Sequence, residues 1–153
     1  MKMKARVERI LVVDDDERIL ESISGYLVLK GFEVEGAKTA AEALKKLPNS
    51  DLDLAILDIR LTDMDGTELL SKIHEIKPSM VKIMLTGYPD ADNAVRSLNN
   101  GADAYLVKPV TSEELEKLVR EKLEERKAES ELHGERLVDY IESRDKEFSE
   151  RDS

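Results

Sequence analysis

Polar groups follow four apolar stretches of the chain, each at the point where a buried strand would end. They are the acids Asp14, Asp15 and Asp16 after residues 10–13, Asp58 after 52–57, Thr86 after 81–85 and Lys108 after 104–107. Because the carboxyl ends of parallel strands meet at one edge of a sheet, we expect these groups to lie together. Carboxylates, a hydroxyl and an amine in one place suit a metal-assisted transfer of a phosphoryl group to an aspartate.

The three carboxylates of Asp14, Asp15 and Asp58 can lie close together only if a cation offsets their repulsion. Oxygen ligands without His or Cys favour Mg²⁺, which keeps several of its waters. The Asp58 carboxylate could then attack a phosphoryl group to form an acyl phosphate. Mg²⁺ and Lys108 would neutralise charge on the transferring oxygens, and Thr86 would donate a hydrogen bond to the new phosphoryl group.

Each piece also has a simpler interpretation when it is taken alone. Asp16 is expected to cap a helix, and a Lys-Pro pair is an ordinary turn. Asp63 and Asp65 are expected to be solvated turn residues, and His74 and His133 to be surface residues. The joint occurrence at four strand ends, in this order, is what makes the pattern specific.

Composition limits the classes of protein that remain. The chain has 153 residues, 41% of them apolar, with no Cys, so thiol chemistry and disulfides are excluded. The net charge of −10 disfavours binding to a nucleic acid. No apolar run reaches the length of a membrane span, and the basic N-terminus lacks the apolar segment of a signal peptide. We therefore expect a cytoplasmic protein.

Strand-like and helix-like segments alternate five times. The expected strands are residues 9–13, 32–37, 52–57, 81–85 and 104–107, and the helices that follow them begin near residues 17, 39, 67, 91 and 112. Continuous apolar runs are typical of a parallel sheet covered on both faces. If the strand order is 2-1-3-4-5, Asp58 ends the central strand, with the acids 14–16 and Thr86 each about 4.8 Å away. Lys108 would start two strands away, so it would need its long side chain to reach in.

The last fifth of the chain differs from the rest. Residues 121–153 hold 12 acidic and 7 basic residues, a net charge of −5. We expect the last helix to continue past residue 123 and to break at Gly134. Beyond the break, a thin apolar face follows Leu137, Val138, Ile141 and Phe148.

The pattern as a whole resembles the receiver domain of two-component response regulators, over residues 8–123. The matching motifs are residues 10–16 (ILVVDDD), 57–58 (LD), 64–66 (MDG), 85–87 (LTG) and 101–109 (GADAYLVKP). The resemblance implies a flavodoxin-like, doubly wound, five-stranded parallel sheet of order 2-1-3-4-5 with five helices. Residues 124–153 would then form an acidic, partly helical C-terminal extension to a stand-alone receiver.

The resemblance also implies a role for each site residue. Asp58 would be the phosphoacceptor, and the Mg²⁺ ligands would be Asp14, Asp15, Asp58 and the backbone carbonyl of Arg60, with Mn²⁺ as a possible substitute. Thr86 and Lys108 would bind the phosphoryl group, and Thr86 and Tyr105 would form the switch. The Lys108–Pro109 peptide would be cis, and the residues that control access would be Arg60, Gly87 and Tyr88. Arg60 and Tyr88 are bulky for these positions and could hinder an attacking water. Ala104 stands where many family members carry a second Asp, which weakens any inference of the dimer typical of DNA-binding regulators.

The implied function is to accept a phosphoryl group from a sensor histidine kinase and to switch contacts with a protein target or a second response regulator. Such a protein catalyses only its own phosphorylation and dephosphorylation. A homodimer is possible, and direct DNA or membrane binding is not expected.

Three other readings stay open. An aspartyl-phosphate hydrolase would usually carry a second Asp at the position of Arg60. A flavin-binding electron carrier shares the topology, but the acids 14–16 would repel its phosphate. A pseudo-receiver that serves only as a docking module would not need the complete site.

Overall fold

Five strands and five helices alternate along the chain in a computed structural model that describes residues 6–48, 51–87 and 90–151. The elements are β1 (Arg9–Val13), α1 (Glu17–Leu29), β2 (Glu33–Ala37), α2 (Ala40–Lys46), β3 (Leu54–Leu57), α3 (Gly66–Ile76), β4 (Val81–Thr86), α4 (Ala91–Asn99), β5 (Ala104–Val107) and α5 (Ser112–Arg151). The predicted alternation is confirmed. Strands β2 and β3 begin one and two residues later than we expected.

The strands form one parallel sheet in the order β2-β1-β3-β4-β5, so the predicted fold class is confirmed. Val13 pairs with Leu57, and Leu57 pairs with Met84. Thr86 pairs with Val107 at the far side. The polar residues that follow these strands therefore reach the same edge of the sheet from four neighbouring strands.

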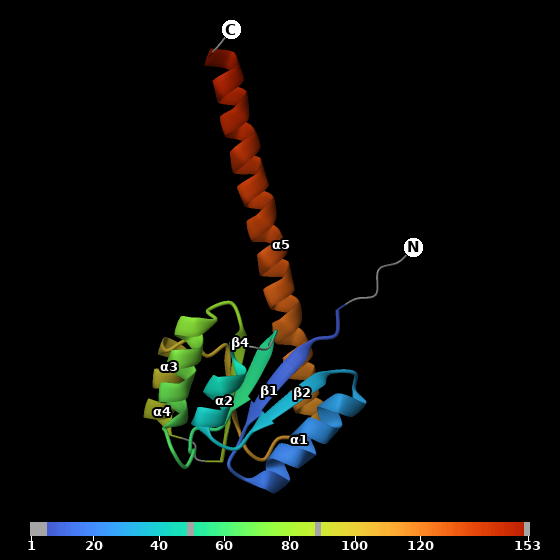
Figure 1. Cartoon of the computed structure of the whole chain (residues 1–153), viewed down its shortest axis with the longest axis vertical. Helices are drawn as coiled ribbons and strands as arrows, with labels where there is room; N and C mark the ends of the chain where they lie inside the picture. Colours follow the sequence, from blue (N-terminus) through green and yellow to red (C-terminus); the bar gives the residue numbers. More distant parts are fainter. Residues whose placement is uncertain (1–5, 49–50, 88–89, 152–153) are drawn as a thin grey trace.

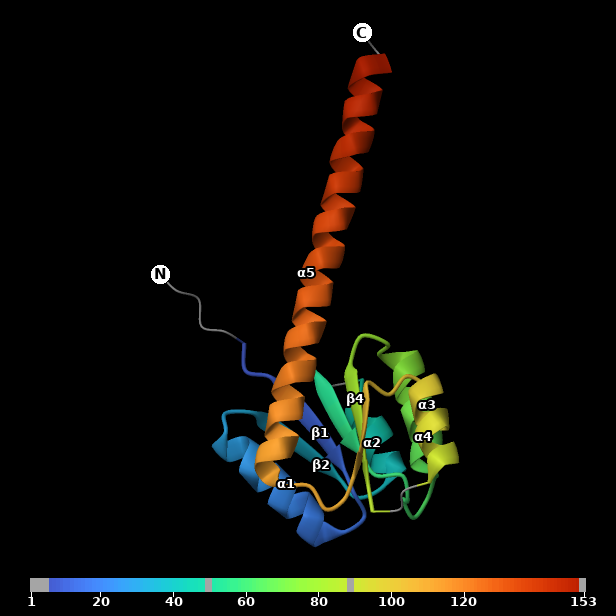
Figure 2. The same cartoon turned by 180° about the vertical axis from the view of Figure 1, so that it is seen from behind.

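Helices cover both faces of this sheet, as Figures 1 and 2 show from opposite sides. Helices α1 and α5 lie on one face, while α2, α3 and α4 lie on the other. Alternation along each strand fills both cores: in β1, Ile10 and Val12 pack toward α1 and α5, whereas Leu11 and Val13 pack toward α2 and α3. Burial on both faces explains why the strands read as continuous apolar runs.

Side-chain caps fix the helix starts that lie near this edge. Asp16 accepts a hydrogen bond from the Arg18 N–H and caps α1, as predicted. At α5, Thr111 and Glu114 each accept a hydrogen bond from the other's backbone N–H, which is a complete capping box. These caps set the point at which the chain leaves each strand end and turns back along the sheet.

Helix α5 is much longer than the other helices and leaves the domain as a single rod (Figure 1). Leu115, Val119 and Leu123 bury its first turns against the sheet, and every described side chain in 127–144 is exposed. The expected break at Gly134 is wrong. An exposed glycine inside a helix costs only about 1 kcal/mol, and the good helix formers around it outweigh that cost. Among the described residues, no helix is apolar enough over sufficient length to cross a bilayer.

The boundary between a domain at 8–123 and a tail at 124–153 remains a prediction, since α5 runs through it without interruption. Within the tail, Leu137, Val138 and Ile141 are exposed, and the side chain of Phe148 lies outside the described part. The tail leaves the domain at the amino-terminal edge of the strands, opposite to the edge that carries the polar groups (Figure 2).

Candidate functional site

The carboxyl ends of β1 and β3 bring three carboxylates together. Asp14, Asp15 and Asp58 each offer an oxygen, and these oxygens lie within 4.8 Å of one another. The backbone explains this placement: the Asp58 N–H donates to the Val13 carbonyl at 3.0 Å, which extends the pairing of the two strands. Asp14 and Asp58 are buried, at 3% and 6% exposure, while Asp15 is exposed.

Lys108 reaches this cluster from β5, two strands away, along a side chain that is mostly buried. Its Nζ donates to Asp14 Oδ2 at 2.8 Å and lies 3.5 Å from Asp58 Oδ2. Burial lowers the pKa of Lys108, but its hydrogen bond to Asp14 and the charges of both acids outweigh burial, and the net pKa is raised. The amine is therefore a firmly held cation. The Lys108–Pro109 peptide bond is cis.

The pKa of Asp58 is raised above its ordinary value. Burial is the main cause, and the charge of Asp14 acts in the same direction, while Lys108 and the Arg60 N–H lower it. That N–H lies 3.3 Å from Asp58 Oδ1. A second cation beside Asp14 and Asp58 would favour the ionised carboxylates, which is the form that can act as a nucleophile.

Thr86 ends β4, and Tyr105 lies on the neighbouring strand β5, where it pairs with Met84. Thr86 is fully buried at the end of β4, and its backbone carbonyl accepts from the Lys108 N–H at 2.8 Å. Tyr105 packs partly buried against the core between the sheet and α2–α3. Its hydroxyl is buried and has no hydrogen-bond partner among the described residues. The hydroxyl has therefore lost its hydration without gaining a hydrogen bond, which costs free energy.

Two of the residues predicted to control access lie at the site, and the third cannot be placed. Arg60 is exposed in the loop that follows Asp58, and Gly87 is exposed directly after β4. A side chain at Gly87 would begin 3.9 Å from Lys108 Cδ, which is ordinary contact distance. Tyr88 lies outside the described residues.

Three residues between the end of β3 and the first residue of α3 have structural roles that we did not predict. Gly66 packs so tightly that a Cβ there would lie 2.0 Å from the Asp58 carbonyl oxygen, so no larger residue fits. Asp63 is exposed as expected, but its carboxylate accepts hydrogen bonds from the Ala40 and Ala41 N–H groups at 2.9 and 3.0 Å. Asp65 is also more than a solvated turn residue, because it caps α3 through the Thr67 N–H.

Another residue that the sequence did not single out lies away from the site. Lys82 is 1% exposed within β4, and its Nζ lies 2.9 Å from His74 Nδ1. Burial lowers its pKa, against the charge of Asp103. His74 is exposed, as is His133, in agreement with their expected surface positions. An apolar run that contains one lysine gives no signal that the lysine is fully buried.

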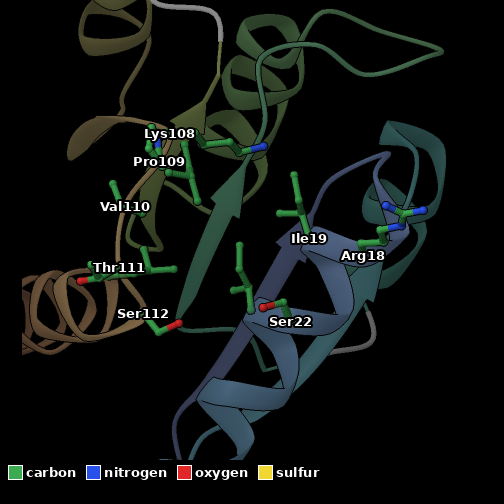
Figure 3. A pocket seen from close by; sticks show the side chains of 11 residues that line it. Arg18, Ile19, Ser22, Lys108, Pro109, Val110, Thr111 and Ser112 are labelled. Atoms are coloured by element: carbon green, nitrogen blue, oxygen red, sulfur yellow. The ribbon is translucent and has the colours of Figure 1, made fainter.

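A pocket of about 500 Å³ opens beside Lys108, between α1 and the segment that joins β5 to α5 (Figure 3). Ile19 and Ser22 line it from α1, and Pro109 and Val110 line it from the other side (Figure 3). Lys108 lines this pocket and also contacts the acidic cluster.

The donor set fits a hard divalent cation. Its side-chain ligands are carboxylate oxygens only, and Mg²⁺ or Mn²⁺ accepts such ligands without nitrogen or sulfur. The repulsion among three carboxylates, which Lys108 offsets only in part, gives the cluster a reason to bind one.

Known proteins match most of the chain. Residues 10–120 match the family model described as response regulator receiver domain. A crystal structure of a CheY-like response regulator receiver domain protein from Methanospirillum hungatei JF-1 has 51% identity and a TM-score of 0.80, over 81% of this chain and 99% of that one. A receiver domain from Clostridium thermocellum has 34% identity and a TM-score of 0.75, over 80% of this chain and 98% of that one.

Among curated proteins, the transcriptional regulatory protein GlrR of Escherichia coli K12 is 32% identical over 80% of this chain. The transcriptional regulatory protein PrrA of Mycobacterium leprae is 37% identical over 78% of it. The matched part is 28% of GlrR and 52% of PrrA, so this chain corresponds to only a part of these relatives.

Proposed function

Because this chain belongs to the response regulator receiver family, we propose that it accepts a phosphoryl group on Asp58 and thereby changes its contacts with other proteins. The observation that supports this best is the buried pair Asp14 and Asp58, with Asp15 beside it and Lys108 reaching both. The phosphoryl donor we propose is the phosphohistidine of a sensor kinase.

In the proposed transfer, an oxygen of the Asp58 carboxylate attacks phosphorus. The bond between phosphorus and the donor nitrogen breaks, and its electron pair leaves with the imidazole, which takes up a proton from water. An acyl phosphate on Asp58 is the product. Hydrolysis of that acyl phosphate by water returns the carboxylate and inorganic phosphate, so the protein turns over only its own phosphoryl group.

Different residues would bind the cation and the phosphoryl group. Asp14, Asp15, Asp58 and the backbone carbonyl of Arg60 would hold Mg²⁺, for which Mn²⁺ can substitute. The bound cation would neutralise the negative charge on the transferring oxygens. Lys108 would shift from Asp14 toward the phosphoryl oxygens, since its Nζ already lies between the two acids.

Thr86 and Tyr105 would carry the signal outward. The Thr86 hydroxyl would donate to a phosphoryl oxygen and move toward Asp58, and Tyr105 would fill the space beside it. Both residues lie on adjacent strands, so a shift of one changes the packing of the other. The result would be an altered surface over α4, β5 and α5.

The output we propose is binding of a protein target or of a second response regulator, with a homodimer as one form. The acidic, exposed part of α5 supports protein contact and opposes direct DNA binding. We place the protein in the cytoplasm, where a sensor kinase would present its phosphohistidine.

The test is incubation of the protein with acetyl phosphate and Mg²⁺, followed by intact-mass measurement. One phosphoryl group should add to the parent, EDTA should prevent the addition, and Asp58→Asn should remain unlabelled. Equal labelling of Asp58→Asn would reject Asp58 as the acceptor. Steady release of phosphate from a simple phosphoester would instead identify a hydrolase, and a folded parent that is never labelled would identify a docking module.

A further inference from the structure

Backbone contacts close the base of the loop between β3 and α3. Arg60 and Asp65 form an antiparallel bridge across it, and the Gly66 N–H donates to the Ile59 carbonyl at 2.6 Å. Residues 61–64 form the tip between these fastenings. Leu61 and Met64 are only partly buried against the core, so apolar packing alone holds the tip weakly.

Asp63 connects the tip of the loop to helix α2 through hydrogen bonds. Its two carboxylate oxygens accept separate hydrogen bonds from the Ala40 and Ala41 N–H groups, at the first turn of α2. These donors belong to the N–H groups that no helix carbonyl can satisfy. Both hydrogen bonds also lower the pKa of Asp63, because they stabilise its ionised carboxylate. An ionised group that meets two N–H donors at a helix start gives a directional, charge-assisted contact.

We propose that Asp63 is a positioning residue for the metal site, because it ties the loop that contains Arg60 to α2. The inference rests on the proposed function, in which the Arg60 carbonyl is a ligand of the cation. With the tip held by α2 and the base held by the Arg60–Asp65 bridge, the Arg60 peptide has a fixed orientation before the cation arrives. Without Asp63, the loop must order itself when the cation binds, and the measured affinity falls.

The chain supplies a matched control at the same helix start. The Thr39 hydroxyl accepts from the Glu42 N–H at 3.1 Å and caps α2 from within its own sequence. Thr39→Ala therefore weakens the start of α2 without releasing the loop. Asp63→Ala does both, and Asp63→Asn keeps one acceptor oxygen for two donors.

The primary measurement is the dissociation constant for Mg²⁺ by calorimetry, on full-length proteins whose thermal unfolding is checked in parallel. Asp63→Ala should bind Mg²⁺ on the order of tenfold more weakly than the parent, as is typical when the support of a metal ligand is lost. Asp63→Asn should lie between them, and Thr39→Ala should match the parent. If Thr39→Ala loses as much affinity as Asp63→Ala, the effect belongs to α2 stability and the proposal fails.

A second measurement uses the reciprocity of coupled binding. If the loop links the cation to α2, saturating Mg²⁺ should slow hydrogen exchange at the Ala40 and Ala41 amides in the parent and not in Asp63→Ala. Unchanged exchange in a parent that binds Mg²⁺ would overturn the positioning role and leave the proposed function intact. A parent that binds no Mg²⁺ would overturn both.

Discussion

Lys108 Nζ lies 2.8 Å from Asp14 Oδ2, so the ammonium already occupies one oxygen of an acid that we assign to the cation. The two positive groups therefore compete for Asp14. We predict that Lys108→Met raises Mg²⁺ affinity by roughly threefold to tenfold, because it removes a nearby positive charge. The same variant should be much slower in phosphoryl transfer, since the cation alone would then offset charge on the phosphoryl oxygens.

Calorimetric titration with Mg²⁺ measures the first effect, and acetyl phosphate labelling measures the second. Lys38→Met is the control, because it removes one positive charge from a surface pair with Glu17. Weaker Mg²⁺ binding by Lys108→Met would mean that Lys108 orders Asp14 rather than competing for it.

Thr86 is assigned to the step after phosphorylation. Its side chain carries no charge and starts from another strand, so Thr86→Ala should leave Mg²⁺ affinity nearly unchanged. It should still accept a phosphoryl group, but NMR signals of Tyr105 should no longer shift on phosphorylation. A large loss of Mg²⁺ affinity in this variant would contradict that division of roles.

The acyl phosphate should be long-lived for this family, because Arg60 is exposed beside Asp58 and can cover its phosphoryl group. We predict that Arg60→Asn combined with Tyr88→Ala speeds the loss of phosphate, measured by intact mass over time. Lys72→Asn, an exposed change on α3, serves as the control for altered net charge. An unchanged decay rate in the double variant would remove steric shielding as the explanation.

Lys82 should make stability depend on pH in a way that is independent of the phosphorylation chemistry. Burial lowers the pKa of Lys82 in the folded protein, so the unfolded chain binds more protons than the folded one. The free energy of unfolding therefore rises with pH between the lowered pKa of the folded state and the ordinary lysine pKa of about 10.4. Lys82→Met should raise the free energy of unfolding by about 1 kcal/mol near pH 7. That advantage should shrink as the pH approaches about 10.

Urea denaturation at the two pH values measures this, with Lys72→Met as the matched exposed lysine. Loss of stability in Lys82→Met at neutral pH would show that the contacts of Lys82 with His74 and the Pro78 carbonyl outweigh its burial.

The tail should serve binding and not chemistry. Truncation after Ala128 should leave labelling of Asp58 intact and lower the affinity for a second copy or a partner, measured by sedimentation and pull-down. Leu137→Ser combined with Ile141→Ser keeps the helix length and removes only exposed apolar side chains. If both proteins keep the parent's oligomeric state and binding, this part of α5 is only solvated surface. Specific DNA binding by the full chain would overturn the larger assignment.

The strand ends could be predicted from the sequence, because an apolar run that stops at a polar residue marks both the strand and the point where the chain leaves the sheet. Parallel topology then brings Asp14, Asp58, Thr86 and Lys108 to one edge without further information. The Asp63 contact was not predictable in this way, since its donors lie 22 and 23 residues away on another helix. In the sequence, an aspartate whose carboxylate binds a distant helix cannot be told from a solvated aspartate in a turn. The difference appears only when the positions of the loop and the helix are known.

Lys82 was not singled out, and the break expected at Gly134 is wrong, for two different physical reasons. Lys82 interrupts an apolar run, and only the packing of α3 against β4 decides that its amine is buried. Gly134 carries a local penalty that favours a break, but the sum over the whole helix decides whether the break occurs.

Because α5 is one continuous helix, its extension would move together with the part that packs on the sheet, as the long arm of a lever. The part of α5 from residue 127 to residue 151 spans roughly 35–40 Å at 1.5 Å per residue, and its pivot would be the buried face around Val119 and Leu123. The far end lies about 45 Å from that pivot, so a tilt of about 5° displaces it by about 4 Å. Sub-ångström adjustments under α5 would therefore be amplified into a readable displacement without any hinge in the rod.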